Sequence, residues 1–135
     1  MASWFAPEPG DIVWCHFPHL PDRDPGPKPR PGLVLRVDER EDGVVVEVVY
    51  GTSKKTTELK AGEFAIRSVS GEAYRVSGLS CDTKFDFKVK IDLPWSGEFF
   101  KVAPGAPFGQ SPKLGTLHAS LVRAAATAHA AAAAR

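Results

Sequence analysis

Arg30 is the residue in this sequence best suited to chemistry on a phosphate group. It stands between Pro29 and Pro31, and proline fixes its own φ and keeps the preceding residue extended. The arginine is therefore expected on a rigid segment at the start of a strand. Its guanidinium presents a planar fork of donors that matches two phosphate oxygens, and Lys28 adds a second cation close by.

A second set of groups suited to phosphate follows an apolar stretch of the chain. It comprises two hydroxyls and two ammonium groups, on Thr52, Ser53, Lys54 and Lys55. Gly51 lets another backbone approach this loop closely. If residues 32–37 and 44–50 pair as a hairpin, the start of the first lies beside the end of the second. Alone, Arg30 and Thr52 read as a surface arginine and a turn threonine, but their convergence at one sheet edge favours a binding site.

Short strands joined by turns must position these groups. Alternation and β-forming residues predict five of them, at 10–17, 32–37, 44–50, 62–68 and 83–93. The third is apolar almost throughout and is expected to be central and covered on both faces. In the fifth, Phe85, Phe87, Val89 and Ile91 are expected to face one way. The charged residues of the segment are expected to face the other way, namely Lys84, Asp86, Lys88, Lys90 and Asp92. Residues 71–79 have room for one helical turn.

The remaining segments complete one expected domain over residues 1–135. A proline-rich loop is predicted at 18–31, an irregular stretch at 94–113, and a closing helix at 114–135 with Thr116 as its N-cap. The expected fold class is α+β, mainly β: a small, strongly bent barrel with a C-terminal helix.

Composition narrows the classes of function. The formal net charge of +1 argues against a strong, non-specific grip on duplex nucleic acid, although local basic clusters can still bind phosphate. No apolar run approaches the roughly 18 residues that span a membrane, and the first residues do not resemble a secretion signal. A cytoplasmic location is expected, with Cys15 and Cys81 as buried free thiols and a disulfide as the alternative.

Motifs for nucleotide-driven or zinc-dependent chemistry are missing from the sequence. There is no phosphate-binding loop of the nucleotide hydrolases and no paired metal-ligand spacing. His16 and His19 lie close together, but two histidines without a third ligand are weak evidence for a metal. We therefore expect neither a metal nor another cofactor.

The order of the short motifs resembles the MazF/PemK family of toxin endoribonucleases. Its members begin with "GD-hydrophobic-W", continue through "RP" before a second strand, and close a third strand on threonine; "GDIVWCHFP", "KPRPGLVL" and "VEVVYGTSK" occupy those places here. The later "TKFD" and "LPW" are similar to a variant branch, and "KLGTLHASLVRAA" is similar to its closing helix. The resemblance covers most of the chain.

This resemblance implies an SH3-like barrel that forms a homodimer and cleaves single-stranded RNA, such as mRNA, without metal. The family reaction is an attack by the ribose 2′-hydroxyl on the adjacent phosphate. By carry-over, Arg30 stabilises the charge that develops on the phosphorus and can also transfer a proton, while Thr52 donates to the scissile phosphate. A type II toxin also implies a cognate antitoxin protein, whose acidic tail would dock on Lys28, Arg30, Lys54 and Lys55.

The sequence departs from the family in the loop before Arg30, where relatives often carry an acid and a serine. His19 and Asp24 are the candidates for the group that removes the 2′-hydroxyl proton. Trp95, on a turn, is the aromatic residue most expected to be exposed for base stacking. Trp14, Phe99 and Phe100 are the other candidates, and most of the four are expected in the core.

Two alternatives remain open at this stage. One is a non-catalytic SH3-like module that uses the same groove to bind nucleic acid or a peptide. The other is a structural domain in which Arg30 only makes an ion pair, with Asp11 or Glu58.

Overall fold

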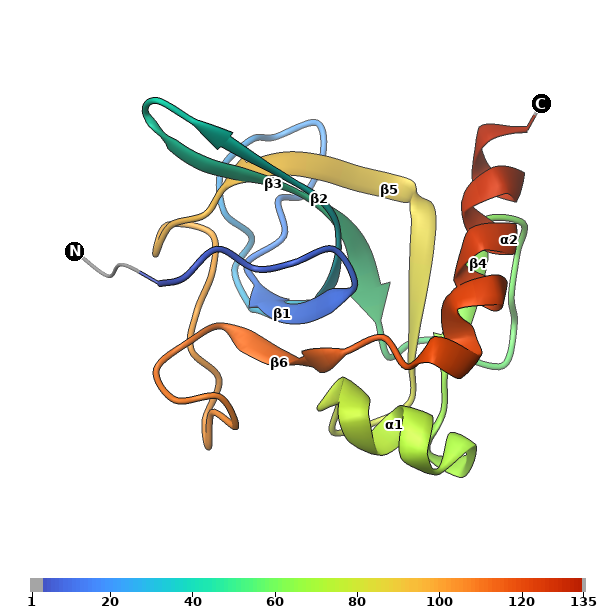
Figure 1. Ribbon diagram of the computed structural model, residues 1–135. Helices are drawn as coiled ribbons and strands as arrows, with labels where there is room; N and C mark the ends of the chain where they lie inside the picture. The colour runs from blue at the N-terminus through green and yellow to red at the C-terminus, as the bar shows by residue number, and fades with distance from the viewer. Residues whose placement is uncertain (1–3, 135) are drawn as a thin grey trace.

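The computed structural model describes residues 4–134, which form a six-stranded antiparallel sheet and two α-helices (Figure 1). The strands are β1 (Asp11–Cys15), β2 (Arg30–Arg40), β3 (Gly43–Thr52), β4 (Glu63–Ile66), β5 (Thr83–Pro94) and β6 (Lys113–Thr116). The helices are α1 (Glu72–Ser77) and α2 (Val122–Ala133), and each follows a short 3-10 turn, at Ser68–Ser70 and Ala119–Leu121. The mainly β class with a C-terminal helix is as predicted.

The sheet has the order β4-β5-β3-β2-β1-β6, so β3 is an interior strand with β5 and β2 on its two sides. β2 and β3 form the expected hairpin, closed by the pair Arg40–Gly43. The register shifts within β2, and again in β5, where Val49 pairs with Lys90 but Tyr50 with Asp86. Such irregularities bend and twist a sheet locally, and β5 turns sharply in Figure 1.

Apolar side chains cover both faces of the central strands. One buried cluster includes Ile12, Leu33, Val49, Phe64 and Phe85; the other includes Val13, Cys15, Val34, Val48 and Phe100. Neighbouring residues of β1, β2 and β3 enter different clusters because side chains alternate along a strand. The prediction that residues 44–50 are central and covered on both faces is therefore confirmed.

The predicted start of the closing helix was wrong. Residues 113–116 instead form β6, whose backbone pairs with the edge of β1 in the pairs Asp11–Thr116 and Ile12–Gly115. A Cβ on Gly115 would lie 2.2 Å from the Val76 carbonyl oxygen, so this strand lies tightly against the end of α1. Helix α2 begins only at Val122, and Thr116 does not cap it. Arg135, the predicted last residue, lies outside the described residues.

Three further sequence predictions need correction. The proline-rich loop covers 16–29 rather than 18–31, because Arg30 already pairs with Cys15 as the first residue of β2. Cys81 is exposed, not buried, whereas Cys15 is buried and its burial raises the pKa of its thiol well above the ordinary value. Lys84 was assigned to a polar face but is buried, because it pairs with Glu63 on β4.

Candidate functional site

The β2–β3 hairpin brings Arg30 and Thr52 to the same edge of the sheet. Gly32 pairs with Tyr50, and the same register two residues further along both strands sets Arg30 opposite Thr52. The strands approach closely here, because a Cβ on Gly51 would lie 2.5 Å from the Pro31 carbonyl oxygen and 2.8 Å from the Phe85 ring. The predicted convergence of the two residues is therefore confirmed.

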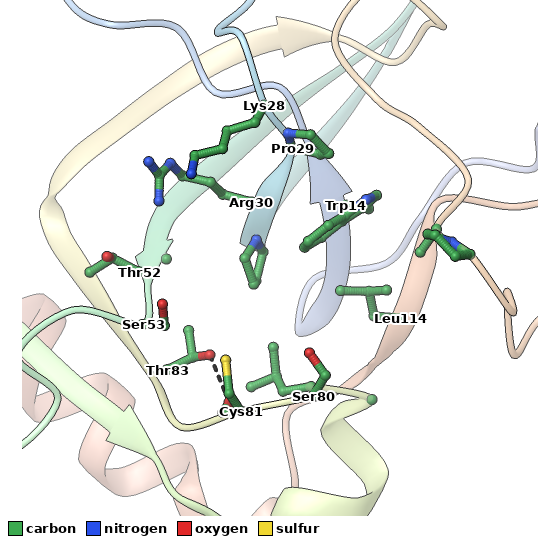
Figure 2. A pocket seen from close by; sticks show the side chains of 16 residues that line it. Trp14, Lys28, Pro29, Arg30, Thr52, Ser53, Ser80, Cys81, Thr83 and Leu114 are labelled. Carbon is green, nitrogen blue, oxygen red and sulfur yellow. Dashed lines mark hydrogen bonds between the residues drawn. The ribbon is translucent and has the colours of Figure 1, made fainter.

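Arg30 and Thr52 both line a pocket of about 460 Å³. Lys28 lies beside Arg30, and Ser53 follows Thr52 at the same edge (Figure 2). Trp14 and Leu114 line the opposite side, and the connector between α1 and β5, residues 78–81, closes the pocket below them. The pocket thus has a cationic and hydroxyl-bearing wall facing an apolar wall.

Arg30 is held without a carboxylate partner in the part of the chain that the structure describes. Its guanidinium carbon lies 5.8 Å from the centre of the Tyr50 ring, a cation–π contact that leaves the donors free. Asp11 pairs instead with Lys113, at 3.5 Å, and no ion pair joins Arg30 to Glu58 among residues 4–134. The ion pair with Asp11 or Glu58 that the structural alternative gives to Arg30 is therefore wrong.

The Thr52 hydroxyl accepts a hydrogen bond from the Lys54 N–H at 3.2 Å, which leaves its own proton available for donation to an anion. The loop after Thr52 is held by hydrogen bonds from two cationic side chains, those of Lys84 and Arg67. Lys84 Nζ donates to the Glu58 carbonyl at 3.0 Å, and the Arg67 guanidinium donates to the Thr56 carbonyl. These contacts hold the loop relative to β4 and β5.

His19 and Asp24, the candidate proton acceptors, are exposed on loop 16–29 and do not line the pocket. His16 fixes this loop, since its Nδ1 lies 2.9 Å from the Gly26 carbonyl oxygen. A Cβ on Gly26 would meet the Phe17 carbonyl oxygen at 2.2 Å, so the loop is packed closely at that point. The described residues that line the pocket include no histidine and no carboxylate.

Three other residues predicted to bind substrate also lie outside the pocket lining. Lys54 and Lys55 are exposed on the loop beyond Ser53. Trp95 is half-buried, with an edge-to-face contact to Trp4 and a tilted contact to Phe100, and its indole N–H donates to the Phe5 carbonyl at 3.1 Å. Its predicted exposure on the turn was therefore wrong in part.

Sequence reasoning missed the connector at residues 78–81 as a wall of the pocket. Gly78 ends α1 with a positive φ of 71°, and a Cβ there would lie 1.8 Å from the Leu114 carbonyl oxygen. Gly78 is thus the one residue in the sequence that could have indicated this wall, since a glycine after a short helical segment is typical of a helix end. The contact partner, 36 positions later in β6, is not visible from the sequence.

Residues 4–134 contain no group of three histidine, cysteine or acidic side chains placed to hold a metal ion. No helix in that range is long and apolar enough to cross a membrane. The chain matches no protein-family model and no curated protein sequence.

Proposed function

We propose that this protein is the toxin of a type II toxin–antitoxin system, a metal-independent endoribonuclease that cleaves single-stranded RNA. One observation carries the proposal: Arg30 and Thr52, whose side chains are suited to bind phosphate, come from different strands and meet at one pocket with Lys28 beside them. The order of sequence motifs similar to the MazF/PemK family supports the same conclusion.

In the proposed reaction, the 2′-oxygen of a ribose attacks the adjacent phosphorus and the bond from phosphorus to the 5′-oxygen breaks. The products are a 2′,3′-cyclic phosphate and a free 5′-hydroxyl. Arg30 holds two phosphate oxygens and stabilises the charge that develops on them, and Thr52 donates a hydrogen bond that fixes the phosphate. Since no imidazole or carboxylate lines the pocket among the described residues, water takes the 2′-hydroxyl proton in this scheme. Arg30 gives a proton to the leaving 5′-oxygen, and the proton that the water took up then restores the Arg30 guanidinium.

The proposal extends to the fold type and to partners. We propose that the strongly bent six-stranded sheet is an SH3-like barrel and that the cytoplasmic protein forms a homodimer. The exposed ammonium groups of Lys54 and Lys55 extend the cationic edge made by Lys28 and Arg30. An acidic, disordered antitoxin tail that docks along this edge would cover the pocket and block RNA.

The test is cleavage of a long single-stranded RNA in excess EDTA, with the product ends mapped. Wild-type protein is expected to make discrete cuts that leave cyclic phosphates. Arg30→Ala and Thr52→Ala are each expected to lower the cleavage rate by about 10²–10³, the usual effect of removing a donor that stabilises a transition state. Arg36→Ala, on the same strand but paired with Asp92, and Thr57→Ala, on the same loop, serve as matched controls.

A second function is favoured by the lack of a histidine or carboxylate in the pocket lining. This second function is a non-catalytic RNA-binding module. It would be supported if the well-folded wild-type protein left RNA intact but bound it more tightly than Arg30→Ala does. Cleavage that persists undiminished in both Arg30→Ala and Thr52→Ala would instead place the reaction elsewhere.

A further inference from the structure

The pocket is larger and chemically more varied than a phosphate requires. A volume of about 460 Å³ lies within the range of about 300–1,000 Å³ typical of small-molecule sites. The cations stand on one wall only. Trp14 and Leu114 stand on the other, and the Cys81 sulfur is directed toward the space between them (Figure 2).

We infer that this apolar wall is a subsite for one nucleobase next to the scissile phosphate, and that Ser80 and Cys81 select which base it takes. The inference rests on the proposed cleavage of RNA. It adds the recognition of a base to the binding of a phosphate, with Trp14 as the stacking surface.

Trp14 is suited to stacking because its backbone is fixed and its ring is only half-buried. The backbone N–H of Trp14 donates to the Pro112 carbonyl at 2.9 Å, and the backbone carbonyl of Trp14 accepts from the Lys101 N–H at 3.1 Å. Trp14 also pairs with Pro31 in the β1–β2 ladder, so it lies one strand away from the residue after Arg30. A base on Trp14 is therefore adjacent to a phosphate on Arg30.

The connector has its own fixed geometry, which leaves two polar side chains available. Leu79 N–H donates to the Ser77 hydroxyl at 3.2 Å, Asp82 accepts from the Ser68 N–H at 2.7 Å, and the Thr83 hydroxyl donates to the Cys81 carbonyl at 3.0 Å. Within residues 4–134, the side chains of Ser80 and Cys81 make no hydrogen bond, and both residues are exposed at the pocket.

A hydroxyl and a thiol on a rigid backbone beside an aromatic ring can read the edge of a stacked base. The hydroxyl both donates and accepts, and the thiol is a weak donor and acceptor. Bases of single-stranded RNA are free to be read in this way, because they are unpaired and able to unstack. A peptide tail would use the cations equally well, but it has no need of hydrogen-bonding groups beside the aromatic ring.

The experiment compares the bases that flank the cuts made in a random-sequence RNA pool. Ser80→Ala and Cys81→Ala are each expected to change the ratio of cleavage rates between the preferred base and the other bases at one flanking position by about fivefold or more. Ser70→Ala, which lies outside the pocket, is the matched control. A flanking-base preference identical to wild type in both Ser80→Ala and Cys81→Ala would overturn the subsite.

Stacking is tested separately with substitutions that replace Trp14 by another large apolar side chain, so that the protein still folds. Trp14→Phe retains an aromatic face and is expected to cleave within about threefold of wild type. Trp14→Leu retains only the apolar volume and is expected to lose about 5- to 100-fold, the usual effect of removing a stacking partner. Equal rates in Trp14→Leu and wild type would overturn the stacking role.

A binding measurement separates this inference from the proposed nuclease. Short oligonucleotides with a 2′-deoxyribose at the cut position cannot react, so calorimetry reports binding alone. Base-dependent affinity that Cys81→Ala alters would support the subsite even if the wild type cleaved nothing. Cleavage by the wild type with base-independent affinity would retain the nuclease and overturn the subsite. If an acidic peptide displaced the oligonucleotide and lost affinity in Trp14→Leu and Cys81→Ala, while the oligonucleotide did not, the apolar wall would be a peptide site.

Discussion

Arg30 combines a fixed backbone with a guanidinium that pairs with no carboxylate among residues 4–134. It lies between two prolines, pairs with Cys15 across the ladder, and contacts Tyr50 through the face of its ring. A long side chain usually loses much rotamer freedom when it binds an anion. In Arg30, part of this rotamer freedom is already lost on folding, because the backbone and the contact with Tyr50 orient the guanidinium before an anion binds.

Gly51 is the residue on which this arrangement most depends. Gly51→Ala is expected to lower the free energy of unfolding by about 1–3 kcal/mol, because the added methyl group would meet the Pro31 carbonyl and the Phe85 ring, both held in the core. Denaturant unfolding measures the change. Gly97→Ala is the matched control, since a Cβ there meets nothing within 4 Å; equal stability of the two variants would contradict the close approach of the strands.

At the scale of elements, β4, β5 and the loop after Thr52 are joined by one buried ion pair. Lys84 and Glu63 lie 3.0 Å apart, with their side chains 9% and 8% exposed. Burial opposes ionisation of Glu63, but hydrogen bonds from the Lys60 N–H and the Lys84 ammonium outweigh it and lower the pKa of the carboxyl. Lys84 also donates to the Glu58 carbonyl, so the pair holds the loop as well as the two strands.

The sign of this pKa shift gives a pH dependence. A carboxyl whose pKa is lower in the folded state stabilises the fold above its unfolded pKa, near 4.5, and loses that stabilisation as the pH falls through the folded value. Glu63→Gln is therefore expected to be less stable than wild type at pH 7 and to lose less further stability between about pH 5 and 3. Urea unfolding across this range measures both. Parallel curves for the two proteins would show that Glu63 carries no pH-linked stability.

At the scale of the whole molecule, the proposed toxicity is itself measurable. Expression of the wild-type chain in bacteria is expected to stop growth within one generation time or so, because cleavage of mRNA halts protein synthesis. Arg30→Ala is expected to restore growth at the same protein level, and Arg36→Ala is expected to remain toxic. Growth curves with quantified expression measure this, and free growth on soluble wild-type protein would contradict an active toxin.

Much of the fold and half of the site follow from local patterns. The hairpin of β2 and β3 was predictable from two apolar stretches. The segment between them ends in Asp42-Gly43, a dipeptide typical of hairpin turns, and the pairing of the two strands sufficed to bring Arg30 to Thr52. The β6 segment was not predictable, because its helix-compatible residues are held extended by pairing with the edge of β1. Tertiary pairing overrides weak local preference in such short segments.

The apolar wall of the pocket depends on contacts between distant parts of the chain. Trp14 was noted as an aromatic, but its position opposite Arg30 requires the β1–β2 register. Ser80 and Cys81 reach the pocket only because Gly78 packs against β6. His19 and Asp24 belong to the loop that leads into Arg30, yet no pattern in a loop of this length shows which of its side chains face the pocket.

The β2–β3 hairpin has a second end. Its tip, Glu41 and Asp42, is exposed and lies about 36 Å along the chain of β2 from Arg30, given roughly 3.3 Å per residue. An epitope or a short peptide inserted at this tip would sit at the far end of a paired ladder from the pocket. The tip is thus an attachment point through which the protein can be immobilised or labelled while the edge that carries the pocket stays open.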